Sequence, residues 1–335
     1  MGVAKGFTDI PGIKVGHATD LEGLTGCTVI LCEGGAAAGV EIRGAASGSQ
    51  EIDSLSPFHV TDRIHGLVLA GGSAFGLEAA SGVRRYLEQK GVGFDMRVAR
   101  VPIVPAAILF DLSLGKATAR PTREMGMTAA AMASDGPVME GNVGAGTGAS
   151  VGKIHGIGRA MKAGIGTATV ALEGKYQGVL VSAIAAVNAW GDIRDPETGK
   201  ILAGARVSAT SRDFVDTIRE MKRGVTAPAQ PAANTTLVAV ATNAGLSKLQ
   251  ATRVAQLAQV GLSRVVSPCY TRIDGDIVFC LSPLESKLTG KRRVADVDTL
   301  GVAASEAVAE AIVRAVKLSA GLGGIPGLGA TKGKD

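Results

Sequence analysis

The pattern of apolar and polar positions along the chain predicts short strands separated by helices. The apolar runs that predict strands are 25–32, 37–43, 66–70, 166–172, 179–187, 237–241 and 276–281. Most of these runs are hydrophobic at successive positions, which is typical of strands whose sheet is covered on both faces. The sequence therefore predicts sheets buried between other layers of structure.

Apolar residues at helical spacing predict helices between these strands, over 74–89, 247–262 and 297–318. We expect Ser73 to cap the first helix and Ser247 to cap the second, because a serine hydroxyl accepts hydrogen bonds from the first-turn N–H groups. The segment 321–335 is rich in glycine and follows the last helix. We expect it to be a mobile tail.

Length and composition indicate a large core. The chain has 335 residues, of which 46% are hydrophobic, and we expect one domain spanning 1–335. Its longest apolar stretches, 101–109 and 179–187, are shorter than the roughly 18 residues that a membrane-spanning helix needs. The start of the chain lacks the apolar core of a secretory leader. We therefore expect a cytoplasmic protein with no membrane partner.

Charge and residue usage argue against nucleic-acid and metal chemistry. The net charge of +5 is modest, and aromatic residues make up only 3% of the chain, so few side chains offer stacking platforms for bases. The cysteines form no C-x-x-C pair and the histidines show no ligand spacing (Cys27, Cys32, Cys269, Cys280; His17, His59, His65, His155). We expect no nucleic-acid partner, no metal and no other cofactor.

The strongest break in composition lies immediately before Thr235. A Pro/Ala-rich segment, 224–233, leads into Asn234, Thr235 and a buried strand pattern. Breakage of the Asn234–Thr235 bond would give Thr235 both a nucleophilic hydroxyl and a terminal amine, whose ordinary pKa is about 7.7 to 8. The sequence therefore suggests an N-terminal-nucleophile amidase that is cut into chains 1–234 and 235–335. The alternative is an ordinary surface loop before a strand.

Several polar residues lie in otherwise apolar or glycine-rich surroundings. Lys153 ends a glycine-rich run, Asn188 ends an apolar run, and Asp274 and Asp276 flank a glycine before a strand. Amide hydrolysis needs a nucleophile, a base, an oxyanion donor and a group that orients the base. The Thr235 hydroxyl, its amine or Lys153, the Asn188 amide, and the aspartate pair fill these roles in order. A hairpin turn is the alternative for the Asp-Gly-Asp segment.

The glycine-rich segment 144–156 keeps a different class of function open. Residues 144–149, Gly-Ala-Gly-Thr-Gly-Ala, fit the relaxed dinucleotide-binding pattern. Further glycines at 152, 156 and 158 follow where the phosphate-binding helix should begin. A nucleotide-binding module that uses this loop is the alternative to an amidase.

Ordered segments along most of the chain resemble the DmpA-type L-aminopeptidase D-amidase/esterases, a family that includes β-peptidyl aminopeptidases and nylon-oligomer hydrolases. The matching segments are Thr8–His17, Gly71–Ala80, Val101–Ala107, Gly141–Ala149 and Asn234–Thr236. In this family the precursor cuts itself ahead of a serine or threonine, which corresponds here to Thr235. The nylon-hydrolase branch implies that Lys153 is the catalytic lysine, Asn188 the oxyanion asparagine, and Asp274 and Asp276 the paired aspartates. The aminopeptidase branch has Ser and Glu at those last two positions.

The resemblance also implies a fold and a substrate class. The expected fold is an α/β four-layer αββα sandwich of the N-terminal-nucleophile type, and the expected assembly is a homo-oligomer, a tetramer of αβ units. The expected substrate is a small peptide or amide. Phe110 corresponds to a tyrosine near the scissile carbonyl in some members, and Glu140 is a candidate for binding a substrate ammonium, with a surface acid as the alternative. An acyltransferase of the ornithine acetyltransferase type remains an alternative activity.

Overall fold

The computed structural model describes residues 5–226, 234–284 and 295–330, and its largest element is a mixed sheet. The strands follow the order β10-β11-β14-β16-β2-β4-β7-β3, and β1 pairs with β2 off this path. Their bounds are β1 Lys14–Asp20, β2 Thr25–Ile42, β3 Gly48–Gln50, β4 Ile64–Ala70, β7 Ala106–Ile108, β10 Ile165–Ala171, β11 Leu180–Asn188, β14 Thr235–Thr242 and β16 Ile277–Pro283.

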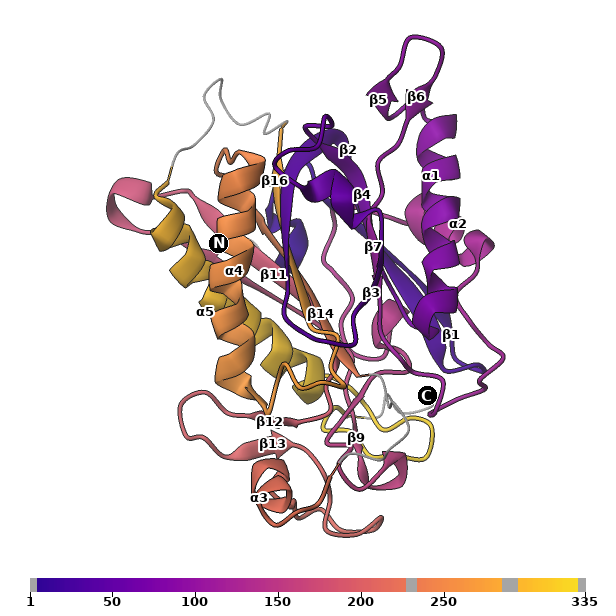
Figure 1. Cartoon of the computed structure of the whole chain (residues 1–335), viewed down its shortest axis with the longest axis vertical. Coiled ribbons are helices and arrows are strands. Elements are labelled where there is room, and N and C mark those ends of the chain that lie inside the picture. Colours follow the sequence, from indigo (N-terminus) through magenta and orange to yellow (C-terminus); the bar gives the residue numbers. More distant parts are fainter. Residues whose placement is uncertain (1–4, 227–233, 285–294, 331–335) are drawn as a thin grey trace.

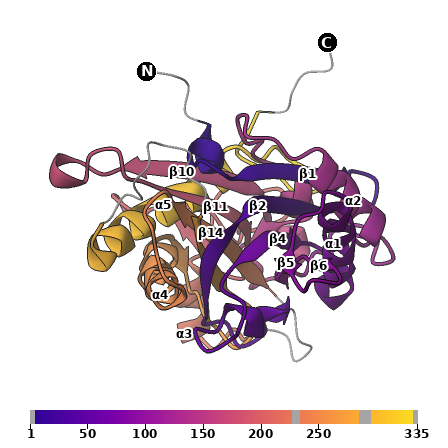
Figure 2. The same ribbon diagram turned by 90° about the horizontal axis from the view of Figure 1, so that it is seen from above.

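Strand β2 belongs to both halves of this sheet. Its first part, residues 25–31, pairs with β1 and β4, and its last part, residues 36–42, pairs antiparallel with β16. The register with β4 shifts between Leu31 and Ala36, so a bulge redirects the strand. The sequence predicted two strands here, 25–32 and 37–43, whereas the chain forms one long strand that folds the hydrogen-bonded network into two layers (Figure 2).

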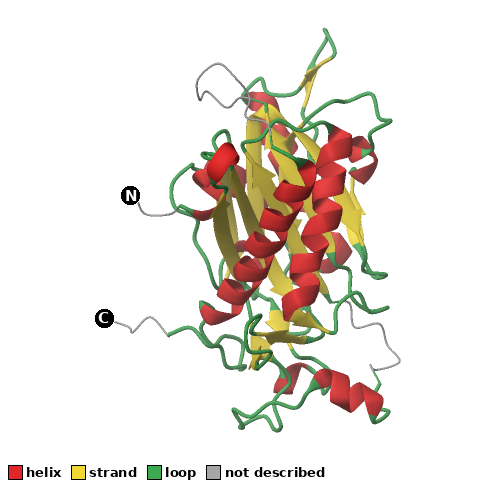
Figure 3. Ribbon diagram, turned by 90° about the vertical axis from the view of Figure 1, so that its left-hand side faces the viewer, coloured by secondary structure: helices red, strands yellow, loops and turns green. Residues whose placement is uncertain are grey.

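Helices cover the outer face of each layer. The principal helices are α1 Ala79–Gln89, α2 Arg123–Ala131, α4 Lys248–Val265 and α5 Val297–Lys317. Figure 1 shows α4 and α5 on one side of the strands and α1 and α2 on the other, and Figure 3 shows two long helices lying across the strands. Ser247 forms a capping box with Gln250 at the start of α4, as the sequence predicted.

Three apolar cores separate these layers. Alternate residues of β14 point to opposite faces: Leu237 belongs to the core between the two strand layers, and Val238 to the core under α4 and α5. On β4, Leu69 joins the same central core, whereas Val68 packs with α1 and α2. The layers therefore run helix, strand, strand, helix, which confirms the predicted αββα sandwich.

Glycines allow the layers to approach one another closely. A Cβ atom on Gly166 of β10 would lie 2.1 Å from the carbonyl oxygen of Ala311 in α5. A Cβ atom on Gly261 of α4 would lie 2.1 Å from the carbonyl oxygen of Ser305 in α5. Neither glycine has a positive φ, so the requirement at both positions is for space rather than for backbone freedom.

Smaller elements lie outside the sandwich. Helix α3 and the sheet of β13, β12 and β15 lie at one end in Figure 1, and the β5–β6 hairpin projects from the other end. Their bounds are α3 Thr217–Lys222, β5 Phe94–Asp95, β6 Arg100–Val101, β8 Ser150–Val151, β9 Met161–Lys162, β12 Asp192–Arg194, β13 Ile201–Ala203 and β15 Val266–Ser267. Among the described residues, no helix has the length and apolar character needed to cross a membrane.

Two local predictions differ from the structure. Ser73 does not cap a helix: it is the first residue of a 3-10 helix, Ser73–Glu78, its φ is 55°, and its side chain makes no capping hydrogen bond. The predicted mobile tail is held in its first ten residues, where the Lys162 N–H donates to the Pro326 carbonyl (2.8 Å) and the Gly329 N–H to the Ser319 carbonyl (2.8 Å). Residues 331–335 lie outside the described part, as do residues 227–233 of the Pro/Ala-rich segment before Asn234.

Candidate active site

Thr235 is the first residue of β14, at the centre of one strand layer. The strand lies between β11, to which it is antiparallel, and β16, to which it is parallel. Because side chains alternate along a strand, Thr235 faces the same side as Leu237, toward the space between the two strand layers. Its exposed fraction is 1%, so the hydroxyl is shielded from solvent in the uncut chain.

The peptide bond before Thr235 is held at its carbonyl oxygen. The Asn234 oxygen accepts hydrogen bonds from the Thr235 hydroxyl (2.6 Å) and from the Gly275 N–H (2.6 Å). The Asn234 N–H donates to the Ile273 carbonyl (2.9 Å), and Asn234 forms a parallel bridge with Asp274. The ladder between β14 and β16 thus continues past both strand ends and fixes this bond.

Asn188 links Thr235 to Lys153. It is the last residue of β11 and the register partner of Thr235. Its Oδ1 accepts from Lys153 Nζ (2.7 Å) and from the Ser150 N–H (3.1 Å), and its Nδ2 donates to the Phe110 carbonyl (2.8 Å). The structure therefore brings together three residues that the sequence singled out.

Lys153 is a half-buried residue, and no carboxylate of the described residues bonds directly to its amine. Besides Asn188 Oδ1, its Nζ donates to the Asn188 carbonyl (3.0 Å). Burial lowers the pKa of Lys153 to about 7, against the opposing effect of the negative charges on Asp274 and Asp111. An amine with this pKa is partly neutral at physiological pH, which suits it to act as a base.

The two aspartates hold the backbone on either side of the site. Asp276 Oδ1 accepts from the Thr236 N–H (2.7 Å) and its Oδ2 from the Tyr270 N–H (3.0 Å). Asp274 Oδ1 accepts from the Trp190 N–H (3.1 Å), and its Oδ2 accepts from the Thr271 hydroxyl. Each carboxylate therefore binds separate neighbours, and together they fix the backbone before and after the site.

Burial raises the pKa of both carboxyls. Burial, followed by the negative charge of Asp274, raises the pKa of Asp276 to about 7. Burial also raises the pKa of Asp274, while the Thr271 hydroxyl, the Trp190 N–H and Lys153 act in the opposite direction. Perturbed pKa values beside a candidate nucleophile are typical of catalytic sites.

Two further predicted residues have different positions. Phe110 reaches the site through its backbone, because its carbonyl oxygen accepts from Asn188. Glu140 does not join the site: its carboxylate is paired with Arg314 (2.5 Å) and accepts from the Thr167 N–H (2.9 Å). A carboxylate engaged by a guanidinium and a backbone N–H is a poor receptor for a substrate ammonium, so the substrate-binding prediction for Glu140 is not supported.

Two buried ionisable side chains beside this cluster, Asp111 and Lys162, were not predicted from the sequence. Asp111, next to Phe110, accepts from the Gly72 N–H (2.7 Å) and from the Thr25 hydroxyl (2.7 Å). Lys162 donates to the carbonyls of Gly146 (2.9 Å) and Ala149 (2.7 Å), and burial lowers its pKa to about 7. The available signal was a lone lysine within the apolar stretch 160–165.

The glycine-rich loop is not built as a nucleotide site. Residues 144–146 form a short 3-10 helix, and the next element is the two-residue strand β8 rather than an α-helix. The Gly144 N–H donates to the Thr19 hydroxyl (2.8 Å) and the Ala145 N–H to the Thr28 hydroxyl (3.1 Å). These amides are already bonded to side chains of the sheet, so they do not form a phosphate cradle.

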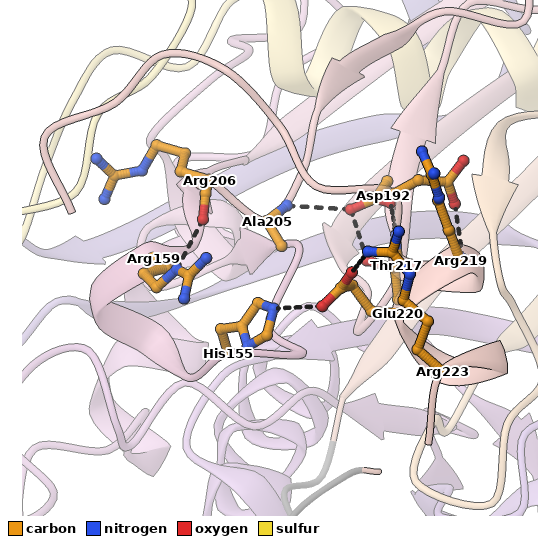
Figure 4. Close-up of polar contacts among 10 residues, drawn as sticks. His155, Arg159, Asp192, Ala205, Arg206, Thr217, Arg219, Glu220 and Arg223 are labelled. Atoms are coloured by element: carbon orange, nitrogen blue, oxygen red, sulfur yellow. Dashed lines mark hydrogen bonds and ion pairs between the residues drawn. The ribbon is translucent and has the colours of Figure 1, made fainter. Parts of the chain in front are cut away.

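A second polar cluster connects α3 to the loop that carries Lys153 (Figure 4). His155, two residues beyond Lys153, lies 3.4 Å from a Glu220 carboxylate oxygen on α3. Asp192 accepts from the Thr217 N–H (2.8 Å) and from the Ala205 N–H (3.0 Å), and burial raises its pKa to about 6. These contacts anchor α3, which directly precedes the segment leading to Asn234.

Comparison with known sequences gives consistent matches over nearly the whole chain. The sequence model of peptidase family S58 matches residues 5–328. An uncharacterized aminopeptidase of Mycobacterium leprae is 36% identical, covering 96% of this chain and 92% of that protein. A 6-aminohexanoate-oligomer endohydrolase of Kocuria sp. is 31% identical, covering 92% of this chain and 85% of that protein.

Solved structures give the same fold. A β-aminopeptidase of Burkholderia sp. matches with a TM-score of 0.68 at 24% identity, covering 98% of this chain and 92% of that chain. The L-aminopeptidase D-Ala-esterase/amidase of Ochrobactrum anthropi, described as a variant of the Ntn-hydrolase fold, matches with a TM-score of 0.70 at 20% identity, covering 96% and 88%. The αββα sandwich is therefore of the N-terminal-nucleophile type.

Proposed function

The chain belongs to peptidase family S58, and from this membership we propose that it is a self-processing amide hydrolase whose nucleophile is Thr235. The observation that carries the proposal is the arrangement at the start of β14. The Thr235 hydroxyl lies 2.6 Å from the carbonyl oxygen of its own preceding peptide bond. Asn188, the register partner of Thr235, binds the amine of Lys153.

Self-cleavage begins with attack on the bond before the nucleophile. The Thr235 Oγ1 bonds to the carbonyl carbon of Asn234, and the neutral amine of Lys153 takes the hydroxyl proton. The C–N bond then breaks, and the departing nitrogen receives a proton. Water hydrolyses the resulting ester, which leaves a carboxylate on Asn234 and a free hydroxyl and amine on Thr235.

The freed terminus then acts on substrate in the same way. The Thr235 hydroxyl attacks the substrate's amide carbon, with either its own amine or Lys153 as base, and forms an ester with the acyl part. Water releases the acid and restores the hydroxyl. Asp276 orients the nucleophile by holding the Thr236 N–H, and Asp274 orients the segment after Asn188 by holding the Trp190 N–H.

We place the substrates among small peptides and linear amides. Relatives of this chain are named as aminopeptidases and as 6-aminohexanoate-oligomer endohydrolases, and both names describe hydrolysis of an amide bond. The resemblance to the nylon-hydrolase branch at Asp274 and Asp276 supports linear amide oligomers as the first compounds to test, with amino-acid amides second.

A pair of isosteric variants tests the proposal. Thr235→Val removes the nucleophile's hydroxyl and keeps its branched shape, and Thr236→Val does the same for the next residue, whose side chain points to the opposite face. We expect wild type and Thr236→Val to give fragments 1–234 and 235–335 on a denaturing gel. We expect Thr235→Val to stay intact and to be inactive. A wild-type chain that is active while uncut contradicts the proposal.

A further inference from the structure

We propose that the backbone N–H of Gly275 is the oxyanion donor for the Asn234–Thr235 bond and, after cleavage, for the substrate carbonyl. This inference rests on the proposed function and deepens it, because it adds a group that stabilises charge in the transition state. The sequence singled out the two aspartates that flank Gly275, but it gave the glycine no role.

The N–H is aimed at the carbonyl by the sheet itself. In the parallel ladder that joins Asn234 to the segment before β16, the Asn234 N–H donates to Ile273 and the Gly275 N–H donates back to Asn234. The second bond is 2.6 Å long, just under the roughly 2.7 to 3.2 Å that is usual between an N–H donor and an oxygen. A donor fixed by a sheet needs no reorganisation when negative charge develops on the oxygen.

Attack removes one of the two donors that the described residues provide to this oxygen. In the uncut chain, the Asn234 oxygen accepts from both the Thr235 hydroxyl and the Gly275 N–H. When Oγ1 bonds to the carbonyl carbon, the hydroxyl proton passes to Lys153 and one donor is lost, just as the oxygen becomes an anion. The bond from the Gly275 N–H persists through this step.

The residue at 275 must be small as well as correctly placed. A Cβ atom there would lie 2.7 Å from Thr235 Oγ1, 2.7 Å from the Ala46 carbonyl oxygen and 2.9 Å from the Cα atom of Ser47. Gly275 has no positive φ, so its backbone conformation does not demand glycine. The absence of a side chain is what lets the hydroxyl and the N–H reach the same oxygen.

The contacts of Asn188 give it a different part in the same step. Its Nδ2 donates to the Phe110 carbonyl, and its Oδ1 accepts from Lys153. Through these bonds Asn188 positions the base against the strand that carries Thr235. Once the Asn234 carboxylate has left, the substrate's carbonyl oxygen takes the place of the Asn234 oxygen and meets the same N–H of Gly275.

The test removes one N–H without adding an atom. Cell-free translation with suppressor tRNA charged with glycolic acid replaces Gly275 by its ester analogue, so that an ester oxygen takes the place of the amide N–H. A matched control places the same ester at Gly141. The Gly141 N–H donates to the Ile165 carbonyl (2.7 Å), and this bond is not among the contacts of Thr235. Wild type, both esters and Thr235→Val are followed by the appearance of the smaller fragment on a denaturing gel.

We expect the 275 ester to cut itself on the order of 100-fold more slowly than wild type, the usual cost of losing one oxyanion donor. The 141 ester should keep the wild-type rate. Cleavage of the 275 ester at the wild-type rate overturns the inference, and so does equal slowing of both esters, which would assign the effect to a weaker backbone. Failure of wild type itself to cut would instead refute the proposed function.

A conventional substitution, Gly275→Ala, provides a second test of this position. Gly275→Ala keeps the N–H but introduces the contacts with Thr235 and the Ala46 carbonyl, so we expect it to be intact and inactive. Its melting temperature should lie within a few degrees of that of Thr235→Val, which is also uncut. If a folded Gly275→Ala chain cuts itself as fast as wild type, a side chain at position 275 does not disturb Thr235, and the requirement for glycine is contradicted.

Discussion

Lys153 and Asp276 show how single residues acquire chemistry from burial. Burial lowers the pKa of the lysine and raises that of the aspartate, bringing both to about 7. The resemblance to a known family identified these residues from the sequence. It could not identify Gly275 or the Phe110 carbonyl, because a backbone N–H or C=O is present at almost every position and only the fold decides where it points.

The pKa of Lys153 predicts the pH dependence of self-cleavage. Below pH 7 the amine is mostly protonated and cannot accept the Thr235 proton, and above pH 7 it is mostly neutral. The cleavage rate should therefore rise from pH 6 to pH 8. Precursor made by cell-free translation, moved into buffers between pH 5 and pH 9 and followed on a gel, measures this rate.

Lys153→Met removes the amine that is proposed as the base and keeps a side chain of similar length. It should abolish self-cleavage across this pH range, whereas Lys175→Met, at an exposed lysine, should cut normally. A rate that is independent of pH from 5 to 9 in wild type would show that no group with a pKa near 7 acts as the base.

Among the elements, the strands and helices that the sequence predicted best are those with long apolar patterns. The runs 179–187 and 237–241 correspond to β11 and β14, and the predicted second helix corresponds to α4. The continuity of β2 was not predicted, because Gly34 and Gly35 are typical of a turn. Pairing with β4 on one side of the bulge and β16 on the other keeps these residues in the strand.

The capping box of α4 predicts a measurable stability effect at the level of one helix. Ser247→Ala removes the hydroxyl that accepts from the Gln250 N–H, which should lower the free energy of unfolding by about 1 kcal/mol. Urea denaturation in the uncut Thr235→Val background measures the change.

Ser263→Ala, at an exposed position of the same helix, is the control and should change the stability by less. Self-cleavage of Ser247→Ala should remain normal, because β14 separates this cap from Thr235. Equal effects of the two substitutions would show that the hydroxyl of Ser247 is not a stabilising cap.

On the scale of the whole molecule, the predicted cut falls between strands that remain paired. Strand β14 begins just after the cut. In the sheet it lies between β11, which comes from the chain before the cut, and β16, which comes from the chain after the cut. β16 in turn pairs with β2 from the first part of the chain. Local sequence patterns could not reveal this interleaved order, because strand order depends on contacts between distant segments. Only the family resemblance indicated four layers.

This interleaving predicts that the two fragments stay together after cleavage. Wild type should elute from a size-exclusion column in one peak that contains both fragments, at the same volume as the uncut Thr235→Val chain. The fragments should separate only in denaturant. Elution of 235–335 apart from 1–234 in native buffer would show that strand pairing across the cut is too weak to hold them.

If the proposed cut occurs, the sharing of one sheet by both fragments also predicts how the cut molecule recovers from unfolding. An uncut chain carries all its strands on one polymer, so its return to the native state does not depend on how dilute it is. Once the bond is gone, β14 and β16 must find β11 and β2 by a diffusive encounter between two molecules. The rate of refolding then falls in proportion to the protein concentration. Aggregation of the unfolded fragments therefore competes with refolding more effectively than aggregation of the uncut chain does.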